Sequence, residues 1–243
     1  MKPFAYKNPI PVAAHRGNAK YYPENTIVSF ENALTLDPDM LEIDLHMTRD
    51  HEIIMMHDHK VDRTSDGEGL IREKTLAEMK ALDVGVWKGE QFRGERVPTF
   101  REFLEMLKAH RTDVLVNVEL KDYPADSGDF AYESADRSIA MLEEFNMMDR
   151  ICINTWSGEL NERLAEKYGP DLRIHAYHPQ ETMGRNQKRF VYDYAYCVCL
   201  FGTKAEQADA SSSTISQRPT AWSRGHTIRW TPRSCTTPPL RTA

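Results

Sequence analysis

Apolar residues follow two different spacings along the first two hundred residues of this chain. Short apolar runs, typical of buried strands, alternate with segments in which apolar residues recur at helical spacing. The runs predict strands at 12–16, 40–45, 53–56, 114–121, 151–156, 172–177 and 194–201. Alternating strands and helices are typical of parallel α/β folds, and the number of repeats predicts a TIM (β/α)8-type barrel.

Capping residues predict where the helices begin. Asn25 or Thr26 can cap a helix whose apolar face starts at Ile27. The segments 75–78 and 99–102 both have a threonine followed three residues later by a glutamate, which is the pattern of a capping box. The elements predicted from apolar spacing therefore also have local start signals.

Two segments depart from the alternation. Residues 59–98 are too long and too rich in glycine for a simple connection, so we expect a small insertion after the third strand. From Ala210 onward the chain has no Asp, Glu or Lys but five Arg and four Pro, among many Ser and Thr. We interpret 1–205 as the barrel domain and 206–243 as an atypical tail.

The tail occupies the place where the last strand and helix of a barrel are expected. Those two elements are therefore missing or aberrant in this interpretation. An out-of-frame or disordered segment explains the abrupt change in composition. A basic interaction segment is the alternative explanation.

Composition narrows the class of protein. With 243 residues, 40% hydrophobic and 28% charged, the chain is expected to form one ordinary soluble domain. A net charge of −6 gives no electrostatic reason to expect a nucleic acid or an anionic membrane as partner. No apolar run reaches the roughly 18 residues that a membrane span needs, and the N-terminus has no secretory signal pattern. The four cysteines form no CxxC pair, so we expect reduced thiols and a cytoplasmic location.

Charged side chains gather where the predicted strands end. His15 and Arg16 end the first strand, Glu42 and Asp44 lie on the second, and His57 ends the third. Parallel strands end at one common edge of the sheet, called here the carboxyl edge. Because α/β folds place their chemistry at this edge, we expect a functional site there.

The carboxylates have the spacing of a metal site. Glu42 and Asp44 are two residues apart and therefore share one face of a strand, and Glu119 and Lys121 repeat this arrangement. Adjacent carboxylates repel unless a positive charge lies between them, and a hard divalent cation is suited to oxygen ligands. A solvated strand face and a simple Glu119–Lys121 ion pair are the alternatives. Histidines at the neighbouring strand ends favour the site.

These residues belong to a larger pattern, and the chain resembles the glycerophosphodiester phosphodiesterase family from about residue 12 to 202. The resemblance rests on His15-Arg16-Gly17, Pro23-Glu24-Asn25-Thr26, Glu42-Ile43-Asp44, Thr48-Arg49-Asp50, His57-Asp58, Arg63-Thr64 and Glu119-Leu120-Lys121. The family fold is a TIM barrel with a small insertion after strand 3. His51 replaces a glycine that is usual in the family, and the family's last strand and helix have no recognisable counterpart here.

The resemblance implies a role for each residue. Its metal ligands, for a divalent ion such as Ca²⁺ or Mg²⁺, would be Glu42, Asp44 and Glu119. Its general base and acid would be His15 and His57, and its phosphate-binding residues would be Arg16 and Lys121. A structural ion pair to a strand-end carboxylate is the alternative role for Arg16.

Two further residues have an expected place. We expect His46 to lie past the end of its strand and leave it out of the metal site. Trp156 ends the fifth strand and either walls the substrate pocket or packs in the core.

The implied reaction is metal-dependent hydrolysis of a small-molecule glycerophosphodiester to an alcohol and glycerol 3-phosphate. The first nucleophile is either a glycerol hydroxyl, which gives a cyclic phosphate, or water. A lysophospholipase D or a cyclising lyase acting on lipid head groups is an alternative. An inactive product with an unclosed barrel is another.

Overall fold

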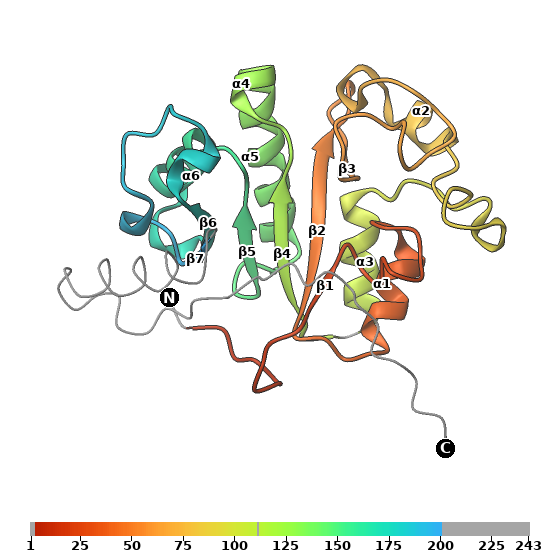
Figure 1. Ribbon diagram of the computed structural model, residues 1–243, viewed down its shortest axis with the longest axis horizontal. Helices are drawn as coiled ribbons and strands as arrows, with labels where there is room; N and C mark the ends of the chain where they lie inside the picture. Colours follow the sequence, from red (N-terminus) through yellow and green to blue (C-terminus); the bar gives the residue numbers. More distant parts are fainter. Residues whose placement is uncertain (1–2, 111, 201–243) are drawn as a thin grey trace, which may run out of the picture.

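One mixed sheet flanked by helices organises the computed structural model, which describes residues 3–110 and 112–200 (Figure 1). The strands are β1 Ala13–His15, β2 Met40–Met47, β3 Ile53–Met55, β4 Leu115–Leu120, β5 Ile151–Asn154, β6 Ile174–His178 and β7 Cys197–Leu200. The α-helices are α1 Ile27–Leu34, α2 Leu76–Ala81, α3 Phe100–His110, α4 Pro124–Ser127, α5 Asp129–Glu144 and α6 Gly158–Tyr168. Short 3₁₀ turns lie at Ile71–Glu73, Glu90–Phe92, Gly169–Asp171, Gln180–Met183 and Val191–Asp193.

Six of the strands follow one another through the sheet in chain order. The order is β1-β2-β4-β5-β6-β7, and each neighbouring pair is parallel. Consecutive parallel strands joined through helices are the arrangement of a (β/α)8 barrel. The described residues therefore form an arc of such a barrel, and the predicted tail 206–243 lies outside them.

The third strand corrects the prediction of a uniformly parallel sheet. β3 pairs with β2 antiparallel, with Leu45 opposite Met55 and Met47 opposite Ile53. A parallel return requires a crossover of about a dozen residues, whereas only residues 48–52 join these strands. The Thr48 amide donates to the Glu52 carbonyl at 2.9 Å and closes the turn. His57 therefore returns toward the middle of β2 instead of ending a parallel neighbour.

The two faces of β2 separate the core from the site. Leu41, Ile43 and Leu45 are fully buried and pack in the main apolar cluster, together with residues of α1, α3, α5 and α6. Because side chains alternate along a strand, Glu42 and Asp44 lie on the opposite face, away from those helices. The apolar packing of one face thus fixes the polar residues on the other.

The segment 59–98 packs as a small unit beside β3 (Figure 1). Its buried side chains pack with Ile54 of β3 and with Met56, which follows that strand; they are Val61, Ile71, Met79, Val84 and Val97. The predicted capping box begins α2: the Thr75 side chain accepts from the Glu78 amide, and the Glu78 carboxylate accepts from the Thr75 amide. The insertion therefore has an apolar cluster of its own.

The residues before β1 are tied to the start of β2. One carboxylate, that of Asp39, accepts from the backbone amides of Lys7, Asn8 and Val12 at 2.5, 3.1 and 2.8 Å. Burial opposes the shift, but the Asn8 side chain, which donates to Asp39 at 2.9 Å, and these backbone amides lower the pKa of Asp39 to about 2. Cys152 and Cys197 are buried, free thiols. Within the described ranges no helix has the length and apolarity to cross a membrane.

Candidate active site

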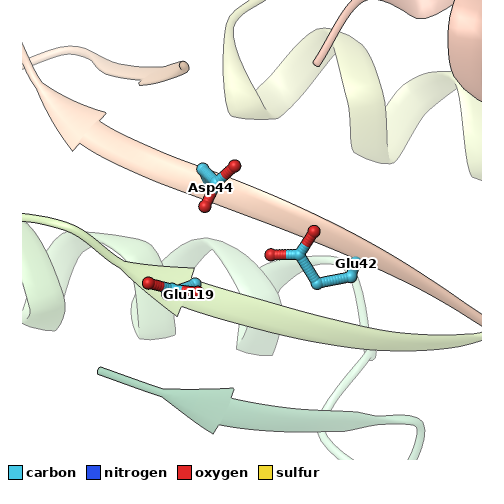
Figure 2. Close-up of side chains that lie close together, drawn as sticks. All are labelled: Glu42, Asp44 and Glu119. Atoms are coloured by element: carbon cyan, nitrogen blue, oxygen red, sulfur yellow. The ribbon is translucent and has the colours of Figure 1, made fainter. Parts of the chain in front are cut away.

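Three carboxylates meet on the face of the sheet opposite the main apolar cluster. Glu42 and Asp44 come from β2 and Glu119 from β4, where Asp44 and Glu119 are direct neighbours in register (Figure 2). One oxygen from each lies within 4.8 Å of the others, and all three side chains are buried. The predicted metal ligands are therefore brought together.

Two cations contact this carboxylate cluster. The Arg16 Nε lies 3.2 Å from Asp44 Oδ2, and the Lys121 Nζ lies 3.1 Å from Asp44 Oδ1 and pairs with Glu119. Burial alone would lower the pKa of Lys121, but the charges of Asp44 and Glu119 raise it above its ordinary value. Lys121 is therefore charged at neutral pH. The ion pairs considered for Arg16 and for Glu119 are both present.

The cluster retains an uncompensated carboxylate that suits a cation. Burial raises the pKa of Glu42 well above its usual range, and the charges of Asp44 and Glu119 add to this rise. Glu42 Oε1 is buried and has no hydrogen-bond partner among residues 3–110 and 112–200. Carboxylate oxygens in this arrangement fit a hard divalent ion.

The two predicted histidines approach the cluster from the same edge of β2, the one opposite β4: His15 ends β1 and His57 follows β3. His15 pairs in register with Glu42, and its Nε2 lies 3.8 Å from Glu42 Oε2. Burial, together with the charge of Arg16, lowers the pKa of His15 to about 4. His57 places its Nδ1 2.5 Å from Asp58 Oδ1. Burial raises the pKa of Glu119, and the positive charge of Lys121 opposes that rise.

Comparisons with known proteins show which family this chain belongs to. A model described as the glycerophosphoryl diester phosphodiesterase family matches residues 15–216. This chain belongs to that family. A glycerophosphodiester phosphodiesterase of Caldanaerobacter subterraneus is 39% identical over 164 residues, which make up 67% of this chain and 64% of that protein. One from Bacillus subtilis is 40% identical over 119 residues, 46% of this chain and 41% of that protein. The chain thus covers less than two thirds of either relative.

Solved structures of the family share the fold. A glycerophosphoryl diester phosphodiesterase from Silicibacter pomeroyi aligns with a TM-score of 0.70 at 24% identity and covers 85% of this chain and 81% of that one. An Oleispira antarctica phosphodiesterase, solved with the product sn-glycerol-3-phosphate, aligns with a TM-score of 0.70 at 23% identity, covering 84% and 81%. These similarities confirm the predicted barrel class.

The Pro-Glu-Asn-Thr segment of this phosphodiesterase family member contributes more than the predicted helix start. Thr26 caps α1, as the sequence allowed, but Asn25 donates from Nδ2 to Asp44 Oδ2 at 2.8 Å. The Glu24 carboxylate forms ion pairs with the guanidinium groups of Arg16 and Arg63, at nitrogen–oxygen distances of 3.0 and 2.7 Å. Sequence reasoning missed both contacts because turn residues carry no apolar period that shows what their side chains touch.

Arg63 joins the insertion to both sides of the site. Its Nε and NH2 lie 2.7 and 3.0 Å from the two oxygens of Asp58, while NH1 and NH2 lie 3.1 and 2.7 Å from those of Glu24. Asp58 in turn contacts the His57 ring. A continuous chain of charged contacts therefore runs from His57 through Arg63 and Glu24 to Arg16.

His46 corrects a further prediction, because it lies inside β2 and not past its end. Its ring is buried, with Nδ1 3.0 Å from Asp122 Oδ1 and Nε2 3.4 Å from the His57 carbonyl oxygen. Asp122 also accepts from the Met47 amide at 2.8 Å and from Ser134 Oγ at 2.6 Å. His46 therefore contacts the backbone of His57. Nothing in the local pattern around Asp122 indicates this pairing.

Trp156 does not pack in the core, so that alternative is wrong. Its side chain is 37% exposed and stacks in parallel on Tyr177 with ring centroids 4.1 Å apart. The ring thus lies beyond the end of β5, at the carboxyl edge of the sheet.

Proposed function

We propose that this protein hydrolyses glycerophosphodiesters to an alcohol and sn-glycerol 3-phosphate. The observation that carries the proposal is that three carboxylates, two histidines and two cations gather at one edge of the sheet. Family membership supports the reaction class, as do relatives named for this activity.

The carboxylate cluster is the proposed site for a divalent cation, with Glu42, Asp44 and Glu119 as its ligands. When bound, Ca²⁺ or Mg²⁺ would offset the negative charge that builds on the phosphodiester oxygens in the transition state. Arg16 and Lys121 are the proposed phosphate-binding residues. Both are charged donors adjacent to the cluster, so they can contact phosphate oxygens that approach it.

The histidines are the proposed proton carriers. In this scheme, His15 accepts a proton from the attacking oxygen, that of water or of a glycerol hydroxyl, as this oxygen bonds to phosphorus. The bond from phosphorus to the alcohol oxygen breaks, and His57 donates a proton to that oxygen. When a glycerol hydroxyl attacks, water then opens the resulting cyclic phosphate to glycerol 3-phosphate. Asp58 contacts Nδ1 of His57, which leaves Nε2 to face the substrate. Each such transfer typically contributes about 10²–10⁴ in rate.

Phosphorus NMR tests which bond is cleaved. The full chain, supplied with Mg²⁺ or Ca²⁺, should convert glycerophosphocholine to glycerol 3-phosphate and choline. Phosphocholine and glycerol as products would refute the proposal, as would intact substrate with a folded protein. Lysophosphatidylcholine in a parallel sample tests the alternative activity on lipid head groups, and we expect it to remain uncleaved.

A further inference from the structure

A buried ring on β2 links the carboxylate cluster to the segment that carries His57. His46 stands two residues after Asp44 on the same face of the strand and is 1% exposed. Its Nδ1 lies 3.0 Å from an oxygen of Asp122, and its Nε2 lies 3.4 Å from the carbonyl oxygen of His57. The ring therefore meets an acceptor at each nitrogen, although neither His46 nor Asp122 takes part in the proposed proton transfers.

Asp122 fixes one end of this ring. Burial would raise the pKa of its carboxyl, but hydrogen bonds from the His46 ring, the Ser134 hydroxyl and the Met47 amide lower it below the ordinary value. A carboxylate only accepts hydrogen bonds, and so does the carbonyl of His57 at the other end of the ring. The two contacts together therefore need a proton on each nitrogen of His46.

Two further rings hold His46 from the side. The His59 ring packs edge-on against it, with centroids 5.1 Å apart and planes at 69°. Tyr123 packs edge-on against His59 in turn, with centroids 5.3 Å apart. These rings and Asp122 fix the direction in which Nε2 points.

The backbone of His57 has few other contacts. β3 ends two residues before it, and the Met56 amide donates to the Asp44 carbonyl at 3.2 Å. Beyond that point, the His46 ring makes the only hydrogen bond to the His57 backbone in the described part of the chain. His46 thus ties the His57 backbone to the strand that carries Asp44, a proposed metal ligand.

We propose that His46 is a positioning residue for the reaction, which holds the His57 carbonyl so that the His57 ring stays within reach of the leaving alcohol. The inference rests on the proposed function, because it takes His57 as the acid. Proton transfer requires hydrogen-bond distance, and a displacement of about 1 Å can cost about 10²-fold in rate. Loss of the contact should therefore affect protonation of the leaving group more than substrate binding.

Two substituted side chains separate the two contacts of the ring. His46→Asn keeps a donor only about as far from the backbone as Nδ1, which faces Asp122. His46→Gln keeps a donor about as far out as Nε2, which faces the His57 carbonyl. His110→Asn, which changes an exposed histidine at the end of α3, is the control.

Two leaving groups separate positioning from a general loss of structure. Glycerophosphocholine releases an alkoxide that needs a proton, whereas the p-nitrophenyl ester of glycerol 3-phosphate releases a phenolate that does not. In the full chain, His46→Asn should lower kcat for glycerophosphocholine about 10–100-fold, with KM and the kcat for the nitrophenyl ester within about threefold. His46→Gln should retain most of the activity on both substrates. Equal losses on both substrates in His46→Asn, or equal losses in the two variants, would overturn the proposal.

Hydrogen exchange tests the contact without the reaction. Measured by NMR on the full chain with the same divalent ion, the Met56 amide should exchange at least about tenfold faster in His46→Asn than in the wild type or in His46→Gln. Equal exchange in His46→Asn and the wild type would rule out the positioning role, whether or not any substrate is hydrolysed. Faster exchange beside a wild type that releases no glycerol 3-phosphate would instead refute the proposed function alone.

Discussion

The negative charges of the buried carboxylates in the site lower the stability of the folded protein. Three buried carboxylates lie within 4.8 Å of one another, and Glu42 has an oxygen without a hydrogen-bond partner in the described part of the chain. Such an arrangement costs free energy unless a cation is bound. The residue types in this cluster are readable from the sequence, whereas its cost depends on how close the backbone brings them.

Replacing Glu42 by glutamine should stabilise the metal-free protein. Because burial raises the pKa of this carboxyl, folding favours its neutral form. The stability this contributes is complete below the usual pKa and is lost as pH rises through the raised pKa. In EDTA at pH 7, the free energy of unfolding of Glu42→Gln should exceed that of the wild type by about 1 kcal/mol. Urea unfolding measures it, and added Mg²⁺ should reverse the order. A variant less stable in EDTA would contradict this account.

The contact between Asp58 and His57 should matter for rate more than for binding. Asp58→Asn replaces the carboxylate at the His57 Nδ1 and weakens the pairing with Arg63. We expect kcat to fall roughly 10–100-fold with little change in KM, in the range found for lost supporting contacts at metal sites. Steady-state kinetics measures this, with the exposed Asp149→Asn as control. An unchanged kcat would show that His57 does not need this partner.

At the scale of elements, the starts of helices were predicted more accurately than the pairing of strands. Capping residues placed the starts of α1, α2 and α3 correctly, because a cap is a contact within one turn of chain. The predicted parallel direction of β3 was wrong, because β3 is antiparallel to β2. The short turn before β3 already excluded a parallel connection. Apolar spacing identifies a strand, but turn length decides how the strand returns.

Asp39 provides an element-scale prediction for stability against pH. It holds the residues before β1 to the start of β2 through three backbone amides. Its lowered pKa, about 2, means that its contribution is complete above about pH 4 and is lost as pH falls toward 2. Asp39→Asn should lower the free energy of unfolding by about 2 kcal/mol at pH 7. The difference should vanish near pH 2, and a difference independent of pH would contradict the assigned role.

At the scale of the whole molecule, the sequence indicated the barrel class and the edge that carries the site, because both follow from the alternation of strands and helices. It could not indicate the network that joins Arg63, Glu24 and Arg16, or the pairing of His46 with Asp122. Those contacts join segments that are distant in the chain and lack a shared pattern. The family match to residues 15–216 reaches beyond the described residues, and the described arc already contains every predicted site residue.

The most direct measurement is metal-dependent release of glycerol 3-phosphate from glycerophosphocholine by the full chain. Wild-type protein is assayed in EDTA and after addition of excess Mg²⁺ or Ca²⁺, beside Glu119→Gln and the control Glu133→Gln, a half-buried residue of α5. The account predicts that EDTA abolishes release, that one of the ions restores it, and that Glu119→Gln loses at least about 10²-fold while Glu133→Gln does not. Release that persists in EDTA, or that survives in Glu119→Gln, would contradict a metal-dependent phosphodiesterase centre at this cluster.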